Sequence, residues 1–332
     1  MLAGFDYTAF GQHLTANLDP NEAAGGIFRA FGTWTLMDRG DTSGALIYKF
    51  EHRHRFTDLS PIAFGLASGS AVPTGLPFSD YEWGVTNLYW RQNFRSGRLN
   101  FIAGKIDATD YLDVYAMVNP WTSFQNLAFS TSPTIAAPDQ GLGFAAGVAL
   151  SDNFYVVAGL NDANGAPRNA GFETFFDRRE YFKSVELGYM SSFERRYLDN
   201  VHLTYWHADE RTRQGVPESW GLAFSAAAFV DDRWLPFLRA GYSEGGAALL
   251  RRSVAAGIGY RFPDTDVFGF GIGWGEPFGD DPREQVSTEL FYRWQVTDVL
   301  AVTPNLQVMI NPSNNPARDT LTFLGVRGRA AF

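Results

Sequence analysis

Cysteine is absent from the 332 residues of the chain, which excludes disulfide frameworks and thiolate metal sites. Basic residues are fewer than acidic residues: the chain has 27 Lys and Arg and 36 Asp and Glu. The resulting net charge of -9 argues against a nucleic-acid partner, since phosphate binding needs a basic surface. No apolar run approaches the roughly 18 to 20 residues of a membrane-spanning helix. A helical membrane anchor is therefore not expected.

Aromatic residues and glycine are abundant instead. The chain contains 29 Phe, 14 Tyr, 9 Trp and 34 Gly, and 45% of its residues are hydrophobic. Aromatic side chains favour strands, whereas glycine favours turns and close approaches of the backbone. This mixture is typical of a β-protein that has one apolar and one hydrated face.

Apolar and polar residues alternate with a period of two along the chain, which indicates strands with two such faces. In LTFLGVRGRAAF, residues 321–332, one face carries Val326 and Phe332, while the other carries Arg327 and Arg329. Successive side chains of a strand point to opposite faces, so one face prefers an apolar surrounding and the other prefers water. The same alternation recurs along the whole chain, with charges in the middle of strands on one face. A soluble sandwich could show this pattern as well.

The lengths of the connections separate a soluble sandwich from a membrane barrel. We expect sixteen strands, at residues 5–16, 26–37, 43–54, 83–94, 98–107, 141–150, 153–161, 181–193, 200–208, 219–230, 234–243, 250–262, 266–275, 285–296, 299–310 and 321–332. Between them, long and short connections alternate. We expect the tight turns at one end of the molecule, among them residues 38–42, 95–97, 151–152, 263–265 and 297–298. Short turns at one end, long loops at the other and an even strand number are typical of an outer-membrane barrel.

The predicted fold class is therefore all-β: a transmembrane, antiparallel, up-and-down β-barrel of 16 strands, with short periplasmic turns and long external loops. Residues 1–332 form this single barrel in the outer membrane of a Gram-negative-type envelope. Outer-membrane lipid and lipopolysaccharide are the expected partners of its outer face. The opening MLAGFDYTAF lacks the basic and apolar regions of a secretory signal, so we expect a mature or trimmed form.

The face that would line the lumen is rich in arginine. It carries Arg29, Arg91, Arg239, Arg251, Arg261, Arg293, Arg327 and Arg329, together with Glu51, Glu186 and Glu289 and the aromatic residues Tyr89, Tyr155 and Trp206. Arg and Glu offer planar hydrogen-bonding groups, and aromatic rings stack on the C–H faces of sugars. This composition favours a path for a sugar or a small polar solute. The alternative is that these side chains only solvate a wide lumen.

The connection over residues 108–140 is the candidate constriction. It contains Trp121, Phe124, Gln125 and Asn126 and is more apolar than an external loop should be, so we expect it to fold into the barrel. Covering a neighbouring subunit is the alternative. The predicted solute path consists of Arg29, Glu51, Arg91, Trp121, Gln125, Trp206, Glu289 and Arg293.

Catalysis is not expected. The five histidines are scattered, and no Gly-x-Ser-x-Gly motif is present, so no catalytic residue, cofactor or metal ligand is assigned. The remaining alternatives are a general, weakly selective diffusion porin and a purely structural barrel. Single-channel recording distinguishes them: an enzyme or a structural barrel would show no stable pore, and a general porin would show no saturable block of the ion current by sugars.

Three stretches and the terminal Phe332 resemble the carbohydrate-selective porins of the OprB type. They are AGKIDATDYLD at 103–113, DNFYVVAGLNDANG at 152–165 and VTPNLQVMINPSNNP at 302–316. The resemblance implies a sixteen-stranded outer-membrane channel that passes monosaccharides and small polyols by diffusion and is narrowed by inward-folded loops. Porins of this size are often homotrimers. The sequence leaves the homotrimer open, because a subunit interface in the wall has nearly the composition of the lipid-facing wall itself.

Overall fold

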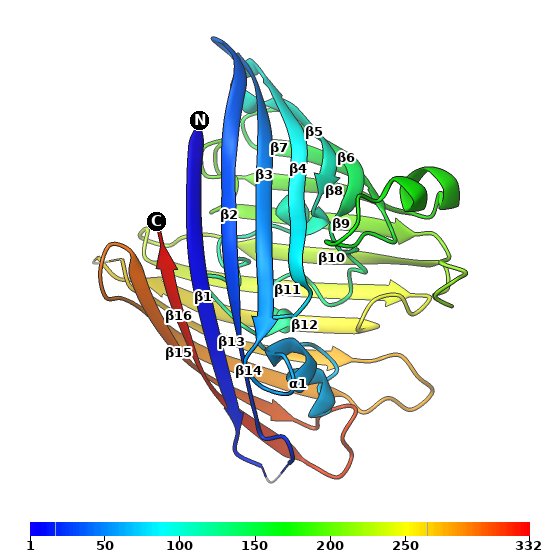
Figure 1. The fold of residues 1–332 in the computed structure, drawn as a ribbon, viewed down its shortest axis with the longest axis vertical. Coiled ribbons are helices and arrows are strands. Elements are labelled where there is room, and N and C mark those ends of the chain that lie inside the picture. The colour runs from blue at the N-terminus through cyan, green and yellow to red at the C-terminus, as the bar shows by residue number, and fades with distance from the viewer. Residues whose placement is uncertain (17, 264) are drawn as a thin grey trace.

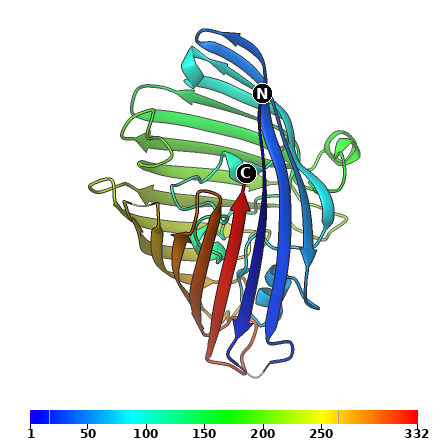
Figure 2. The ribbon, with the colours of Figure 1, turned by 60° about the vertical axis from the view of Figure 1, so that its left-hand side comes forward.

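A computed structural model describes residues 1–16, 18–263 and 265–332. Within these ranges, sixteen strands pair antiparallel with their neighbours in sequence, and β1 pairs with β16 to close a barrel (Figures 1 and 2). The strands are β1 Leu2–Leu14, β2 Glu22–Arg39, β3 Thr42–Arg55, β4 Glu82–Phe94, β5 Leu99–Ile106, β6 Gly141–Ala149, β7 Phe154–Asp162, β8 Tyr181–Met190, β9 Asn200–Ala208, β10 Ser219–Ala227, β11 Trp234–Glu244, β12 Arg252–Arg261, β13 Val267–Glu276, β14 Gln285–Gln295, β15 Leu300–Ile310 and β16 Thr320–Ala331.

The helical segments of the described residues lie in the connections. They are α1 Pro61–Ala67, the 3-10 turns η1 Arg95–Gly97, η2 Ala108–Asp110 and η3 Leu127–Phe129, and the π-helical turn η4 Thr174–Arg178. Helix α1 follows β3, and the hydroxyl of Ser60, the residue before the helix, accepts the Ala63 N–H as an N-cap. Among the described residues, no helix is both long enough and apolar enough to cross a membrane.

The predicted strands are confirmed, and the largest difference in a boundary is at β2. This strand begins at Glu22 rather than at residue 26, because small residues in EAAGG hide the alternation while Glu22 still pairs with His13. Antiparallel order places every second connection at the same end of the barrel. The turns predicted at 38–42, 95–97, 151–152 and 297–298 therefore share the short-turn end, as expected. Asp264, in the turn predicted at 263–265, lies outside the described residues.

The two faces of the strands differ as the alternation predicts. On β16, Val326 is 53% exposed on the outer face, whereas Arg327 is 1% exposed on the inner face. The chain ends close the wall: the N–H of Phe5 donates to the Phe332 carbonyl at 3.1 Å, and the N–H of Phe332 donates back at 2.9 Å. Their rings stack with centroids 5.0 Å apart. Closure removes the free sheet edge, which a lipid surrounding requires.

We expect the change Val326→Arg to lower the free energy of unfolding in lipid vesicles by about 2 to 4 kcal/mol, because it places a charge near the middle of the lipid-facing wall. Urea titration of the folded barrel measures this change. Asn93→Arg is the matched control, since Asn93 lines a cavity of the lumen and its replacement would border water. An equal loss of stability in both variants would contradict the assignment of the two faces.

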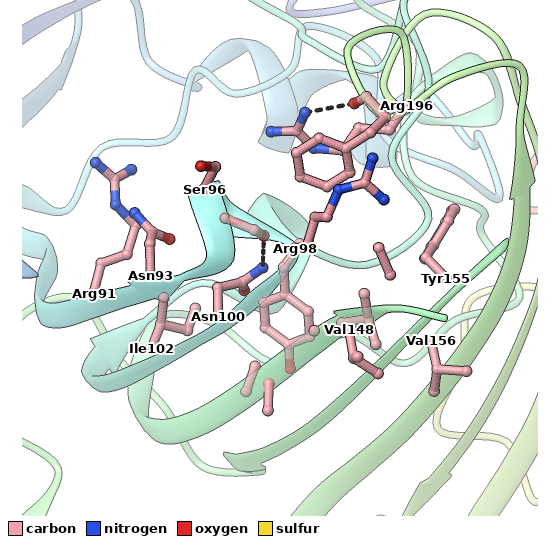
Figure 3. A pocket seen from close by; sticks show the side chains of 18 of the residues that line it. Arg91, Asn93, Ser96, Arg98, Asn100, Ile102, Val148, Tyr155, Val156 and Arg196 are labelled. Atoms are coloured by element: carbon pink, nitrogen blue, oxygen red, sulfur yellow. Dashed lines mark hydrogen bonds between the residues drawn. The ribbon is translucent and has the colours of Figure 1, made fainter. Parts of the chain in front are cut away.

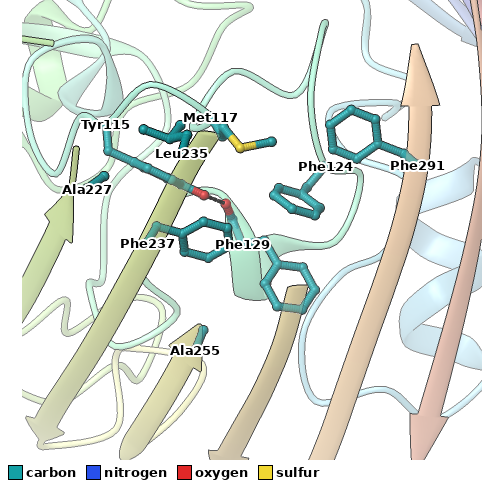
Figure 4. Packing of buried hydrophobic residues seen from close by; sticks show 9 residues of the cluster. All are labelled: Tyr115, Met117, Phe124, Phe129, Ala227, Leu235, Phe237, Ala255 and Phe291. Carbon is teal, nitrogen blue, oxygen red and sulfur yellow. Dashed lines mark hydrogen bonds between the residues drawn. The ribbon is translucent and has the colours of Figure 1, made fainter. Parts of the chain in front are cut away.

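Much of the barrel interior is filled by the β5–β6 loop, residues 107–140. A buried apolar cluster joins this loop to the inner wall; it consists of Tyr115, Met117, Phe124 and Phe129 from the loop and Ala227, Leu235, Phe237, Ala255 and Phe291 from the strands (Figure 4). The Phe124 ring lies 5.8 Å from that of Phe237 and 5.0 Å from that of Phe291. A Cβ at Gly271 would meet the Phe129 ring at 2.8 Å, so glycine is needed where the loop touches β13.

Candidate functional site

The β5–β6 loop is held on one side by a buried glutamate of β14. The Glu289 carboxylate accepts the backbone N–H of Gln125 at 2.8 and 3.0 Å and that of Asn126 at 2.8 Å. It also accepts the side-chain amide of Asn305 at 3.0 Å. Glu289 has no exposed surface. Because a buried carboxylate needs such donors, the loop and the wall stabilise each other at this point.

Arg327 of β16 supports the same part of the loop. Its guanidinium donates to the carbonyl oxygens of Pro120 at 2.7 Å and Ser123 at 2.9 Å. The Gln125 side-chain amide donates to the same Pro120 oxygen at 2.6 Å. Arg327 is therefore a lumen-facing arginine, as its position in the alternation predicts, but its hydrogen bonds fix the loop.

A second buried anchor joins the loop to strands β8, β9 and β11. Asp113 of the loop pairs with Arg239 of β11 and lies 3.2 Å from Nε2 of His202 on β9. It also accepts the Ser132 N–H at 2.7 Å, while its own N–H donates to Glu186 at 2.7 Å. Burial alone would raise the pKa of Asp113, but Arg239 and His202 outweigh burial, so this pKa lies below its usual value. Asp113 therefore stays ionised at neutral pH.

Arg29 of β2 and Trp121 of the loop meet across the lumen. The Arg29 side chain pairs with Asp6 of β1, with Nε 2.8 Å from the Oδ1 atom. Its guanidinium lies 3.5 Å from the centre of a Trp121 ring. Arg329 of β16 donates to the same Asp6 carboxylate at 2.8 and 3.1 Å. The aromatic ring and the guanidinium plane thus form one stacked, partly exposed surface.

Two large cavities lie inside the barrel among the residues that the structure describes. The larger, about 730 Å³, lies toward the long-loop end and is lined by Arg29, Lys49, Trp121 and Asp139, among others; we call it the external cavity. The other, about 550 Å³, lies toward the short-turn end and is called the short-turn cavity (Figure 3). Asp110 and Val114 line both, so the two cavities adjoin at this point of the β5–β6 loop.

The predicted path residues separate into groups. Arg29, Glu51 and Trp121 line the external cavity, and Arg91 lines the short-turn cavity. Arg293 lines neither of them and donates to the Thr265 carbonyl at 3.0 Å. The structure thus brings together three of the residues on the external side.

The remaining three path residues are buried, and so is Glu51, so this conformation does not support a solute contact by these four side chains. Glu51 and Gln125 are each 1% exposed, and Trp206 and Glu289 are each 0% exposed. Trp206 donates from Nε1 to the Thr134 carbonyl at 2.9 Å. Alternation assigned Trp206 and Glu289 correctly to the inner face, but it gave no information about the loop that covers them. A side chain without exposed surface has no contact with a passing solute in this conformation.

Several residues that line the external cavity were not predicted as path residues. Lys49 of β3 and Asp110, Val114 and Asp139 of the loop line the external cavity. The alternation of the strand could have indicated Lys49, because it shares the inner face of its strand with Glu51. No sequence pattern could have indicated the loop residues, since an irregular loop has no periodicity from which to assign the direction of a side chain.

Asp110 and Asp139 give the channel a predicted pH dependence. Partial desolvation raises the pKa of both carboxyls, and Asp107 raises both further, while Lys49 opposes this for Asp110. Both side chains are exposed to the cavity, so solvent screening moderates the effect. As the pH falls below neutral, these carboxyls bind protons before ordinary carboxyls do. The lumen then loses negative charge.

We therefore expect the permeability ratio of anions to cations to rise as the pH is lowered below neutral. The zero-current potential in a salt gradient measures the ratio. The double variant Asp110→Asn/Asp139→Asn should have a raised ratio at neutral pH and a weaker pH dependence. An unchanged pH dependence in this variant would show that other groups titrate.

The barrel and its lumen define a class of protein. A closed antiparallel barrel of sixteen strands, with short turns at one end and a long loop held across the lumen, is a porin-type channel fold. This architecture indicates a channel rather than an enzyme, and it points to the Gram-negative outer membrane.

Comparison with protein families gives a match to the carbohydrate-selective porins, the OprB family, over residues 211–332. This match covers β10 to β16 and confirms the family resemblance noted in the sequence. A comparison with curated proteins finds no match.

Solved structures support the fold independently. The high-pH structure of Pseudomonas putida OprB has a TM-score of 0.78 and 16% sequence identity, over 100% of this chain and 94% of that one. A triple mutant of the Rhodopseudomonas blastica porin has a TM-score of 0.61 and 11% identity, over 100% of both chains. Vibrio cholerae OmpT, in its trimer form, has a TM-score of 0.59 and 14% identity, over 100% of this chain and 98% of that one.

Proposed function

We propose that this protein is an outer-membrane channel for the passive diffusion of monosaccharides and other small, polar, neutral solutes. The observation that carries the proposal is the β5–β6 loop, which is anchored across the lumen and separates two cavities that adjoin at Asp110 and Val114. The loop acts as the constriction, and a solute passes from the external cavity into the short-turn cavity at this junction.

The chemistry of the external cavity suits a sugar. Trp121 and Arg29 present an aromatic face and a planar donor at one surface, and Lys49 adds a further polar group. A channel has to release its solute, so each contact should be weak, on the order of 0.5 to 1.5 kcal/mol for a hydrogen bond. Several such contacts together allow saturable binding and rapid exit.

Charge pairing favours a neutral solute in this cavity. Arg29 pairs with Asp6, and Arg53 pairs with Glu51 at 2.5 Å. These two arginines of the external cavity therefore have internal partners, so they provide hydrogen-bond donors without a large net field. A neutral polyol can accept these bonds without displacing a counter-ion.

Recordings of single channels test the proposal. Monosaccharides should block the ion current in a saturable manner, and Trp121→Ala should raise the half-saturating concentration by roughly 3- to 10-fold, the equivalent of one lost contact. Phe176→Ala is the matched control, because Phe176 is exposed in the β7–β8 connection outside both cavities. A current that no sugar blocks would favour a general, weakly selective diffusion porin.

The same proposal places the outer wall in lipid, with lipopolysaccharide around the long-loop end. A homotrimer is the assembly that we propose, supported by the likeness in fold to a porin whose structure is a trimer form. Chemical cross-linking in native membranes tests the assembly. A product no larger than the monomer would contradict it.

A further inference from the structure

The short-turn cavity is closed partly by a turn that folds into the barrel. The β8–β9 turn, residues 191–199, contributes Phe193, Arg196 and Tyr197 to the lining. The Arg98 guanidinium lies 5.2 Å from the centre of the Phe193 ring, so this turn reaches the β4–β5 turn. The cavity is thus bounded by the two turns and the β5–β6 loop (Figure 3).

Two arginines face this cavity without a carboxylate partner. Arg91 and Arg196 come from different sides of it (Figure 3). Within the part of the chain that the structure describes, neither forms an ion pair, and Nε of Arg91 is buried without a hydrogen-bond partner. Arg196 donates to the Phe193 carbonyl at 2.7 Å. A third arginine, Arg98, is paired with Asp152 at 2.7 Å.

The carboxylates in the same lining already have partners. Glu186 is 2% exposed and accepts the backbone N–H of Asp113 and two hydroxyl groups. Asp110 accepts the side-chain amide of Asn87 at 2.9 Å. Asp41 lies in the exposed β2–β3 turn and accepts a neighbouring hydroxyl at 3.1 Å. These donors are uncharged and leave the carboxylates ionised, so the cavity carries charges of both signs, and Arg91 and Arg196 are the guanidiniums of its described lining that form no ion pair.

One further carboxylate, Glu194, lies in the solvent beside the β8–β9 turn. Its own backbone N–H and the Ser192 hydroxyl lower its pKa, and Arg98 and Arg196 lower it further. Glu194 is therefore ionised at neutral pH and competes with a ligand for Arg196. This leaves Arg91 as the stronger of the two anion contacts.

The rest of the lining suits a hydroxylated ligand. Tyr89, Tyr155 and Tyr197 contribute aromatic rings. Asn93 and Asn100 each donate an amide N–H to a neighbouring group at 3.2 Å, which leaves their carbonyl oxygens to accept hydroxyl groups. The cavity thus combines an unpaired guanidinium with groups that bind sugar rings and hydroxyls.

We propose that the short-turn cavity is a second solute-binding site, selective for carboxylated sugars such as aldonates and uronates. The carboxylate pairs with Arg91, Arg196 adds attraction from the other side, and the asparagines and tyrosines contact the polyol. This proposal rests on the proposed function, since it requires an open channel. It adds to that function a site for anionic sugars, whereas the external cavity favours neutral solutes.

The test is the block of single-channel current by glucuronate, glucose and acetate in the wild-type channel. Glucuronate should have a half-saturating concentration roughly 5- to 10-fold below that of glucose, the equivalent of one charge-assisted hydrogen bond. Acetate, which has the carboxylate but no sugar, should block weakly. Arg91→Gln should remove the advantage of glucuronate and change the block by glucose less than threefold.

Arg95→Gln is the matched control, because Arg95 lies in the turn that directly follows the strand of Arg91, is exposed and does not line the cavity. Arg196→Gln should have a smaller effect than Arg91→Gln and provides a second test should the latter fail to fold. The inference is overturned if glucose passes and blocks normally while glucuronate has no advantage, or if Arg91→Gln and Arg95→Gln behave alike. Absence of any sugar passage would instead overturn the proposed function.

Discussion

Replacing Glu289 by alanine is expected to produce a channel with a larger, noisier conductance that admits oligosaccharides. The variant leaves the N–H groups of Gln125 and Asn126 without an acceptor and Arg327 without its neighbouring carboxylate. Breaking a buried charged contact of this kind costs about 3 to 5 kcal/mol. That cost shifts the loop toward detached conformations by roughly 10²- to 4 × 10³-fold, because 1.4 kcal/mol is tenfold.

The size limit for solutes measures this effect, through the swelling rates of liposomes with mono-, di- and trisaccharides. Glu289→Gln keeps one acceptor oxygen and should have an intermediate effect. Glu22→Ala is the control, since Glu22 is exposed at the start of β2. An unchanged size limit in a folded Glu289→Ala channel would show that the β5–β6 loop does not set it.

The second large effect is expected from Asp113→Ala, which should lower the free energy of unfolding by about 3 to 5 kcal/mol. The change leaves Arg239 buried without its counter-ion and His202 without its carboxylate partner. Urea unfolding in lipid vesicles measures the loss. Because the pKa of Asp113 is lowered in the folded state, its stabilising contribution is present above about pH 4 and is lost as the pH falls through the folded pKa.

A double-mutant cycle separates the energy of the contact between Asp113 and Arg239 from an unspecific loss of stability. Asp113→Ala should cost much less in a background of Arg239→Met, where no buried guanidinium is left unpaired. Asp152→Ala removes an exposed carboxylate that pairs with Arg98, and it should cost at most about 1 kcal/mol. Additive losses for Asp113 and Arg239 would contradict a direct buried pair.

Most of the fold could be predicted from the sequence because the barrel wall has a strict period. Alternation fixes which face each strand residue takes, so Val326 and Arg327 could be assigned to lipid and lumen without a structure. Alternating loop lengths then fixed the topology. The start of β2 was not predicted correctly, because alanine and glycine make neither face clearly apolar or polar.

The candidate site could be predicted only in part, for a physical reason. Alternation indicates that Trp206 and Glu289 point inward, but whether an inward side chain meets solute or protein depends on the path of the β5–β6 loop. That path is set by tertiary contacts such as those of Asp113 and Arg327, which lie far apart in sequence. Arg29 and Trp121 were both assigned to the solute path from the sequence, but the contact between their side chains could be seen only in the structure.

The central claim is that this chain alone forms a size-limited channel for small polar solutes. Its most direct test is the swelling of liposomes that contain only the purified, folded protein, with a series of solutes from glycerol and glucose to a trisaccharide. We expect rapid swelling with glycerol and monosaccharides and little with the trisaccharide. Equal rates across the series, or no swelling with any solute, would contradict the claim.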